Sequence, residues 1–149
     1  MSQARDAHTR IVFLDVDGVL NSIESCKRFG TYRRLDPACV AHLQRIIDQA
    51  GAAIVVSSTW RVLHGLDGMR TVLAEAGLRA DVIDVTPFMG SVRRRIEIGA
   101  WLVDHPEVTS WCSIDDGSDA GPDRLVLTKF EVGLTRADAD AAIAILNAG

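Results

Sequence analysis

The amino-acid sequence predicts an α/β fold, in which a doubly wound and mostly parallel sheet carries helices on both faces. Two observations lead to this prediction. Short apolar runs alternate with helical patterns from one end of the chain to the other. The run AAIVVSS lacks the polar alternation of a half-exposed strand, which is typical of a parallel strand covered on both faces. Right-handed crossovers would wind such elements into one open sheet.

The first half of the chain contains two clear strands and a well-delimited helix. The predicted strands are residues 10–15 (RIVFLD) and 52–58 (AAIVVSS). The helix between them has Asp36 as its N-cap, Pro37 as its first residue and Gly51 as its stop signal. Its expected core face consists of Val40, Leu43, Ile46, Ile47 and Ala50. A second helix is predicted over residues 69–77.

The second half repeats this alternation. Strands are predicted at residues 81–85, 108–116 and 124–128. Between the first two lies a predicted helix over residues 93–105, whose expected core face consists of Ile96, Ala100 and Val103. Thr135, with Asp138 three residues later, forms a variant of the capping box and starts a final alanine-rich helix.

Length and composition indicate one globular domain over residues 1–149. Apolar residues make up 48% of the chain and charged residues 24%, and the net charge of -4 argues against a broadly basic, nucleic-acid-coating surface. The three cysteines form no CxxC pair, which argues against a zinc site and a disulfide framework. The N-terminus has no apolar leader, and no apolar run is long enough to span a membrane. We therefore expect a soluble, cytoplasmic protein without a membrane partner.

Two acidic pairs follow predicted strands. Asp15 and Asp17 alternate with Val16 at the end of the first strand, and Asp115 and Asp116 end another. The carboxyl ends of parallel strands meet at one edge of the sheet, which is where α/β proteins bind ligands. Taken singly, each pair is more often a cap or a turn. Their joint placement favours a cation between them, and oxygen ligands without His or Cys favour Mg²⁺ over Zn²⁺.

The motif VFLDVDGVL resembles the nucleophile motif of the haloacid dehalogenase (HAD) superfamily of phosphatases and phosphotransferases. Similar motifs follow in the family's order: IVVSS for a strand-end Ser or Thr, a basic residue at the start of RRRIEIGAWL, and SIDD for the acidic metal motif. More narrowly, LDVDGVLN, VSSTWR, the spacing of Glu97 and Trp101, and IDD are similar to a small HAD group found in RNA-repair contexts.

The resemblance implies roles for the acidic residues. Asp15 would be the nucleophile that forms an aspartyl-phosphate, and Asp17 would be the general acid that later activates water. Magnesium would be held by Asp15, by Asp17 through its backbone carbonyl, and by Asp115. Either Asp116 or Asp119 would complete the metal site.

The same resemblance implies a hydroxyl and a cation for the phosphoryl oxygens. Ser57 is the expected hydroxyl, and Ser58 is the alternative. Counting back along the helix favours Arg94 as the cation, with Arg93 and Arg95 as alternatives. Positive charge at a helix N-terminus opposes the helix dipole, so an anion nearby would remove the conflict.

Neither residues 19–35 nor residues 86–91 are long enough to fold as a separate cap domain, so we expect a capless HAD protein with an open cleft. The first of these segments interleaves basic and aromatic residues: Lys27, Arg28, Phe29, Tyr32, Arg33 and Arg34. Together with Trp60 and Arg61 they suit a single-stranded nucleic-acid end, through phosphate contacts and base stacking. The alternative is that the arginines are solvated and Trp60 packs under the loop.

The sequence thus predicts a magnesium-dependent phosphomonoesterase whose substrate is a nucleic-acid or nucleotide terminal phosphate. One alternative is a phosphatase for small metabolites, with a lid supplied by a neighbouring subunit. Another is a phosphate-accepting signalling module similar to response-regulator receivers. The last is disfavoured because the acidic motif follows the first strand and carries its own acid, Asp17. The oligomeric state is left open.

Overall fold

The computed structural model describes residues 8–90, 92–121 and 124–149. Five strands form one sheet in the order β3-β2-β1-β4-β5, and all their pairings are parallel. The strands are β1 (Arg10–Leu14), β2 (Ala53–Val56), β3 (Val82–Val85), β4 (Ser110–Asp115) and β5 (Leu125–Leu127). The helices are α1 (Ile23–Phe29), α2 (Pro37–Ala50), α3 (Trp60–Glu75), α4 (Arg94–Val103) and α5 (Arg136–Ala148). The predicted fold class is confirmed.

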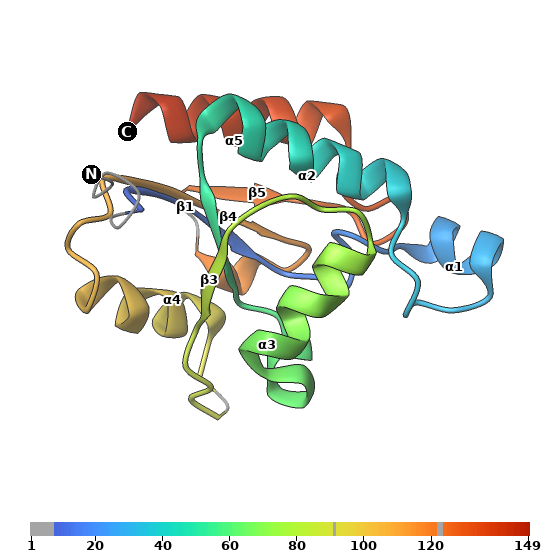
Figure 1. Cartoon of the computed structure of the whole chain (residues 1–149), viewed down its shortest axis with the longest axis horizontal. Coiled ribbons are helices and arrows are strands. Elements are labelled where there is room, and N and C mark those ends of the chain that lie inside the picture. Colours follow the sequence, from blue (N-terminus) through green and yellow to red (C-terminus); the bar gives the residue numbers. More distant parts are fainter. Residues whose placement is uncertain (1–7, 91, 122–123) are drawn as a thin grey trace.

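Helices cover both faces of the sheet. In Figure 1, α2 and α5 lie above it and α4 lies below it. The alternation of side chains along β1 explains the division. Val12 and Leu14 belong to the core cluster that includes α2, α5 and part of α3, whereas Ile11 and Phe13 pack toward α4. The central strand is therefore buried on both sides. Strand β2, for which the unbroken apolar run AAIVVSS predicts cover on both faces, is also buried along its full length.

The caps of two helices agree with the sequence prediction. The Asp36 carboxylate accepts a hydrogen bond from Ala38 N, and Gly51 ends α2 with a φ of 68°. At α5, the Thr135 hydroxyl accepts a hydrogen bond from Asp138 N, while the Asp138 carboxylate accepts one from Thr135 N. The predicted core face of α2 is buried in full.

The predicted core face of α4 is wrong. Ile96 and Val103 are exposed, and the buried residues of this helix are Glu97, Ile98 and Trp101. Trp101 packs edge-on against Phe13, with 5.5 Å between ring centroids. The helix is therefore rotated from the predicted face and buries one carboxylate.

Two further helices differ from the prediction. Helix α3 begins at Trp60 rather than Met69, with a kink at Gly65, where φ is 68° and ψ is -178°. Helix α1 was not predicted; the Ser22 and Ser25 hydroxyls form a reciprocal capping box at its start.

No separate cap domain occurs among the described residues. The excursion that carries α1 begins after Leu20, at the end of the turn that follows β1, and ends at Asp36, whose backbone N–H donates a 2.7 Å hydrogen bond to the Leu20 carbonyl. Its two ends are thus held together, and α1 lies at its outer end (Figure 1). Cys26, Cys39 and Cys112 are free thiols. The expectation that no leader is present concerns mainly residues 1–7, which lie outside the described ranges.

Candidate active site

Three carboxylates converge at the carboxyl edge of the sheet. Asp15 directly follows β1, and Asp115 and Asp116 lie at the end of the neighbouring strand β4. The backbone N–H of Asp15 donates to Ile114 O at 3.0 Å, which brings the two strand ends together. One oxygen from each carboxylate lies within 4.8 Å of the others. We call Asp15, Asp115 and Asp116 the acidic cluster.

Arg94 is the cation that contacts the acidic cluster. It is the first residue of α4, and its Nη1 lies 3.1 Å from Asp15 Oδ1 and 2.7 Å from Asp115 Oδ2. The neighbouring Arg93 and Arg95 are exposed. Of the three arginines that the sequence offers, the structure places Arg94 at the site. Its charge opposes the helix dipole, but the two carboxylates beside it compensate.

The acidic cluster carries more negative charge than Arg94 balances. Burial, reinforced by the charge of Asp115, raises the pKa of Asp15 to about 8, although Arg94 opposes the shift. Burial and Asp115 also raise the pKa of Asp116. Burial alone would lower the pKa of Arg94, but the carboxylates of Asp15 and Asp115 outweigh it, and the net shift is upward. An oxygen-only donor set with excess negative charge fits a hard divalent cation such as Mg²⁺.

The Asp17 side chain is not part of the acidic cluster. Its Oδ1 accepts hydrogen bonds from Asn21 Nδ2 at 2.9 Å and from Trp60 Nε1 at 3.1 Å. The prediction gives Asp17 a place on the metal through its backbone carbonyl only, so the position of its side chain beside Trp60 leaves that ligand a prediction. Of the predicted carboxylate ligands, Asp15, Asp115 and Asp116 lie together. Asp119 lies in a short 3-10 helix, Ser118–Ala120, and is likewise outside the cluster.

Asn21 organises the turn that begins at Asp17. It is fully buried, its Oδ1 accepts from Gly18 N at 2.9 Å, and its Nδ2 donates both to Asp17 and to Tyr32 O. Gly18 has a φ of 78°, and a Cβ at this position would collide with the Asp116 carboxylate. The sequence prediction missed Asn21: an Asn suits a turn, but no local pattern marks the contacts with Gly18, Asp17 and Tyr32.

The two serines after β2 have different environments. The backbone N–H of Ser57 donates to Leu14 O at 2.9 Å, which continues the ladder to the residue just before Asp15. The Ser58 hydroxyl accepts from Trp60 N at 3.1 Å, where α3 begins. Because Ser58 serves the helix start, Ser57 is the better candidate for binding a phosphoryl oxygen.

Arg61 does not fit the predicted place at the mouth of the cleft. It is 5% exposed, and Glu97 Oε1 lies 2.9 Å from its Nη2. Its other N–H groups donate to backbone carbonyls, namely those of Ser57, Ser58, Thr86 and Pro87. The Arg61 side chain therefore connects buried segments of the protein and has no N–H group left to bind a substrate.

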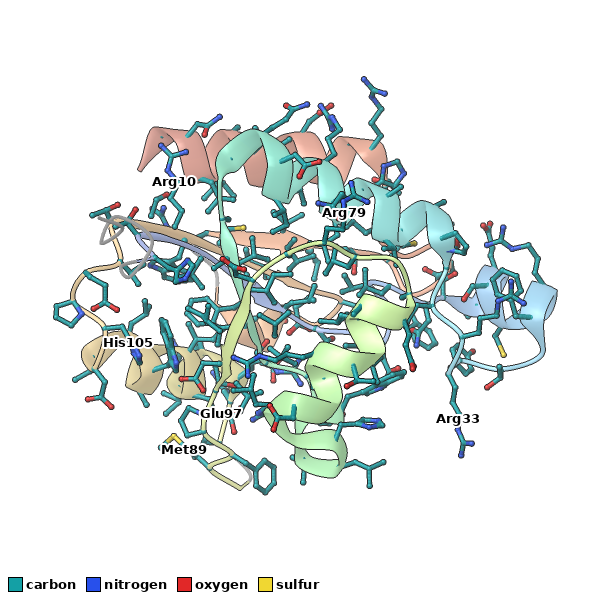
Figure 2. The ribbon with its side chains drawn as sticks, viewed as in Figure 1. Arg10, Arg33, Arg79, Met89, Glu97 and His105 are labelled. Carbon is teal, nitrogen blue, oxygen red and sulfur yellow. The ribbon has the colours of Figure 1, made fainter. Side chains whose placement is uncertain are left out.

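A cleft of about 970 Å³ opens beside Asp17. Its walls come from the loop after α1 and from α3, and include Arg33, Arg34, Trp60 and His64. Arg33 extends away from the ribbon (Figure 2). The Arg34 guanidinium lies over the Phe29 ring, 4.0 Å from its centroid. Of the residues predicted to bind substrate, Arg33, Arg34 and Trp60 thus line the cleft.

The comparison with protein families agrees with this geometry. A model described as the HAD domain in Swiss Army Knife RNA repair proteins matches residues 11–139. The chain belongs to this family. The match includes the acidic cluster of the HAD domain, Arg94 and the walls of its cleft, and it assigns the chain to the HAD-type hydrolases. A search of curated proteins finds no match. Within the described ranges, no helix of the HAD domain has the length and apolarity needed to cross a membrane.

Proposed function

We propose that this HAD domain is a magnesium-dependent phosphomonoesterase that works through an aspartyl-phosphate. The observation that carries the proposal is the convergence of the acidic cluster and Arg94 at one edge of the sheet, with Asp17 beside it at the head of an open cleft. Nucleophile, cation and acid are the groups that phosphoryl transfer requires near one phosphorus atom.

Asp15, Asp115 and Asp116 are the side chains that would hold magnesium. When bound, the ion supplies positive charge that offsets the phosphoryl oxygens and keeps the cluster ionised. Arg94 and the Ser57 hydroxyl hold the remaining phosphoryl oxygens, so that charge is neutralised without any movement during the reaction.

The reaction divides into two transfers. A carboxylate oxygen of Asp15 attacks phosphorus, the bond from phosphorus to the leaving oxygen breaks, and Asp17 donates its proton to that oxygen. Asp17 then takes a proton from water, the resulting hydroxide attacks the phosphorus on Asp15, and inorganic phosphate leaves with the Asp15 carboxylate restored. Asn21 and Trp60 orient Asp17 through the two hydrogen bonds to its Oδ1.

We further propose that the substrate is a nucleic-acid or nucleotide terminal phosphate. The open cleft beside Asp17 leaves room for a large leaving group, and its wall carries Arg33, Arg34 and Trp60, which suit phosphate contacts and base stacking. Membership in a family of HAD domains from RNA repair proteins supports the same class of substrate.

A second candidate is a small phosphorylated metabolite enclosed by a neighbouring subunit. Leu63 favours it, because this side chain lines the cleft and is 85% exposed. An apolar residue in that place would be covered by such a lid.

Phosphate release tests the reaction. The panel contains aryl phosphate, nucleotides, sugar phosphates, and 3'- and 5'-phosphorylated oligonucleotides, each assayed with magnesium and with EDTA. We expect magnesium-dependent release that is fastest on an oligonucleotide end and abolished in Asp15→Asn. Wild-type-like release by Asp15→Asn would remove Asp15 from the nucleophile role, and fastest release from a small metabolite would favour the second candidate.

A pair of double variants tests the substrate class. We expect replacement of Arg33 and Arg34 by Ala to raise KM for the oligonucleotide far more than KM for aryl phosphate. The control replaces Arg79 and Arg136, two exposed arginines outside the cleft, and removes the same charge. Equal losses on both substrates, or equal losses in both double variants, would argue against nucleic-acid selectivity.

A further inference from the structure

The buried ion pair between Arg61 and Glu97 connects three segments: the residues that follow β2, the residues that follow β3, and helix α4. Arg61 has five N–H groups, and each one meets an acceptor. Two acceptors are carbonyls of Ser57 and Ser58, directly after β2. Two more follow β3, and the fifth is the Glu97 carboxylate on α4.

Glu97 completes the connection from the other side. Its Oε1 accepts from Arg61, and its Oε2 accepts from the backbone N–H of Met89 at 2.8 Å, in the link between β3 and α4. Figure 2 shows Glu97 and Met89 close to one another at the lower side of the molecule. Glu97 follows Arg94 by three residues, so it lies one helical turn from the cation that contacts the acidic cluster.

Stability alone does not account for this ion pair. Its side chains are only 3% and 6% exposed, and two apolar residues of similar size often stabilise a protein as well as a buried ion pair does. A guanidinium, however, can hold several acceptors in fixed directions, which an apolar side chain cannot do. The ion pair therefore fixes the positions of the Ser57 backbone, the segment after β3 and the start of α4 relative to one another.

We propose that Arg61 and Glu97 are positioning residues, which hold Ser57 and Arg94 at the distances that the transferring phosphoryl group requires. This inference rests on the proposed phosphatase function. Neither side chain touches the substrate; both act through the two residues that do.

The central variant is Glu97→Gln, which keeps the shape of the side chain but removes its charge and places an amide against the Met89 N–H. With aryl phosphate and saturating magnesium, we expect kcat to fall about 100-fold, because small misplacements of catalytic groups cost that much. KM should stay within about threefold, since the affected contacts strengthen in the transition state. The matched control is Asp140→Asn, which breaks the ion pair between α2 and α5 and should leave both constants unchanged.

A double-mutant cycle separates positioning from a structural role. If Glu97 acts through Ser57, the losses in kcat/KM caused by Glu97→Gln and Ser57→Ala overlap, and the double variant loses much less than their product. A structural role predicts losses that multiply. Arg61→Lys is the second variant and tests the same inference if Glu97→Gln fails to fold. It keeps the charge but not the five directed donors, so we expect the same loss of kcat.

Binding of orthovanadate, a mimic of pentacoordinate phosphorus, gives a readout that needs no turnover. By calorimetry, Glu97→Gln and Arg61→Lys should bind vanadate at least about tenfold more weakly than wild type, because the oxygens of vanadate require the same placement of Ser57 and Arg94. The positioning inference is wrong, and the proposed function stands, if wild type releases phosphate but these variants keep its kcat and its vanadate affinity. The same conclusion follows if the losses in kcat/KM of the two single variants multiply in the double variant. If wild type neither releases phosphate nor binds vanadate, both fail.

Discussion

Replacing Arg94 with Met should have two measurable effects, one on stability and one on activity. The Arg94 side chain is 17% exposed, whereas the side chains of its partners Asp15 and Asp115 are 8% and 4% exposed. Methionine retains much of the apolar stem but removes the charge. Two buried carboxylates then face each other and Asp116 without the cation that offsets their repulsion.

The magnitude follows from the burial of these groups. Removing one partner of a buried ion pair costs about 3–5 kcal/mol, and the partial exposure of Arg94 places this case near the lower end, at about 3 kcal/mol. In a domain of this size each kcal/mol shifts the melting temperature by about 3 °C, so Tm should fall by about 10 °C. Loss of a preorganised cation at the phosphoryl oxygens should also lower kcat by about 100-fold or more.

The assay is thermal denaturation in EDTA at pH 8.5. At that pH more than half of the Asp15 carboxyl is ionised in the wild-type protein, because its pKa is raised only to about 8 while Arg94 is present. Adding magnesium should restore part of the lost Tm. The exposed Arg93 and Arg95, replaced by Met one at a time, serve as controls and should melt within about 2 °C of wild type. An Arg94→Met protein that melts with these controls would refute the assignment of Arg94 as the compensating charge.

Three further predictions concern the same edge of the sheet. In EDTA, the free energy of unfolding should fall as pH rises from about 4 to 8, because the folded state keeps Asp15 protonated up to about pH 8 whereas the unfolded chain releases that proton near 3.8. Denaturant titrations at several pH values would measure this slope, and added magnesium should make it shallower. Gly18→Ala should weaken magnesium binding, by calorimetry, at least about tenfold more than Gly30→Ala, because both glycines have a φ of 78° but only at Gly18 would the new Cβ meet the acidic cluster. Asn21→Ala removes the partner of the Gly18 N–H and of the Tyr32 carbonyl and leaves Asp17 with Trp60 as its one remaining described donor, so it should lower the free energy of unfolding by about 2 kcal/mol and reduce kcat. A wild-type denaturation midpoint would contradict this reading.

The parts of the fold that depend on contacts between residues close in the sequence could be predicted from the sequence. Asp36 and Thr135 cap their helices through contacts within a few residues, and the apolar runs locate the strands to within about two residues. The order of those strands then brings Asp15 and Asp115 to neighbouring strand ends, which is why the positions of the acidic motifs after predicted strands are enough to place them together.

The errors arose where a contact spans a long stretch of sequence. Apolar spacing favoured Ile96 and Val103 for the core of α4, but the helix instead buries Glu97, and it does so because Arg61, 36 residues earlier in the chain, compensates the charge. Nothing local to either residue reveals that pairing. The same contact removed Arg61 from the cleft, where its position beside Trp60 had suggested a substrate contact. The start of α3 was missed because Gly65 interrupts the helical pattern that follows Trp60.

The hydrogen bond between Leu20 and Asp36 has a consequence for how this domain could be altered. The chain between them departs from the sheet and returns to nearly the same point, so its length does not affect the spacing of β1 and α2. The entropy of closing such a loop grows only slowly with the number of residues inside it. Segments of different size could therefore replace the part of this chain that follows Asn21, changing which leaving groups the cleft admits, while Asn21 continues to hold Asp17 and the strand ends stay in place.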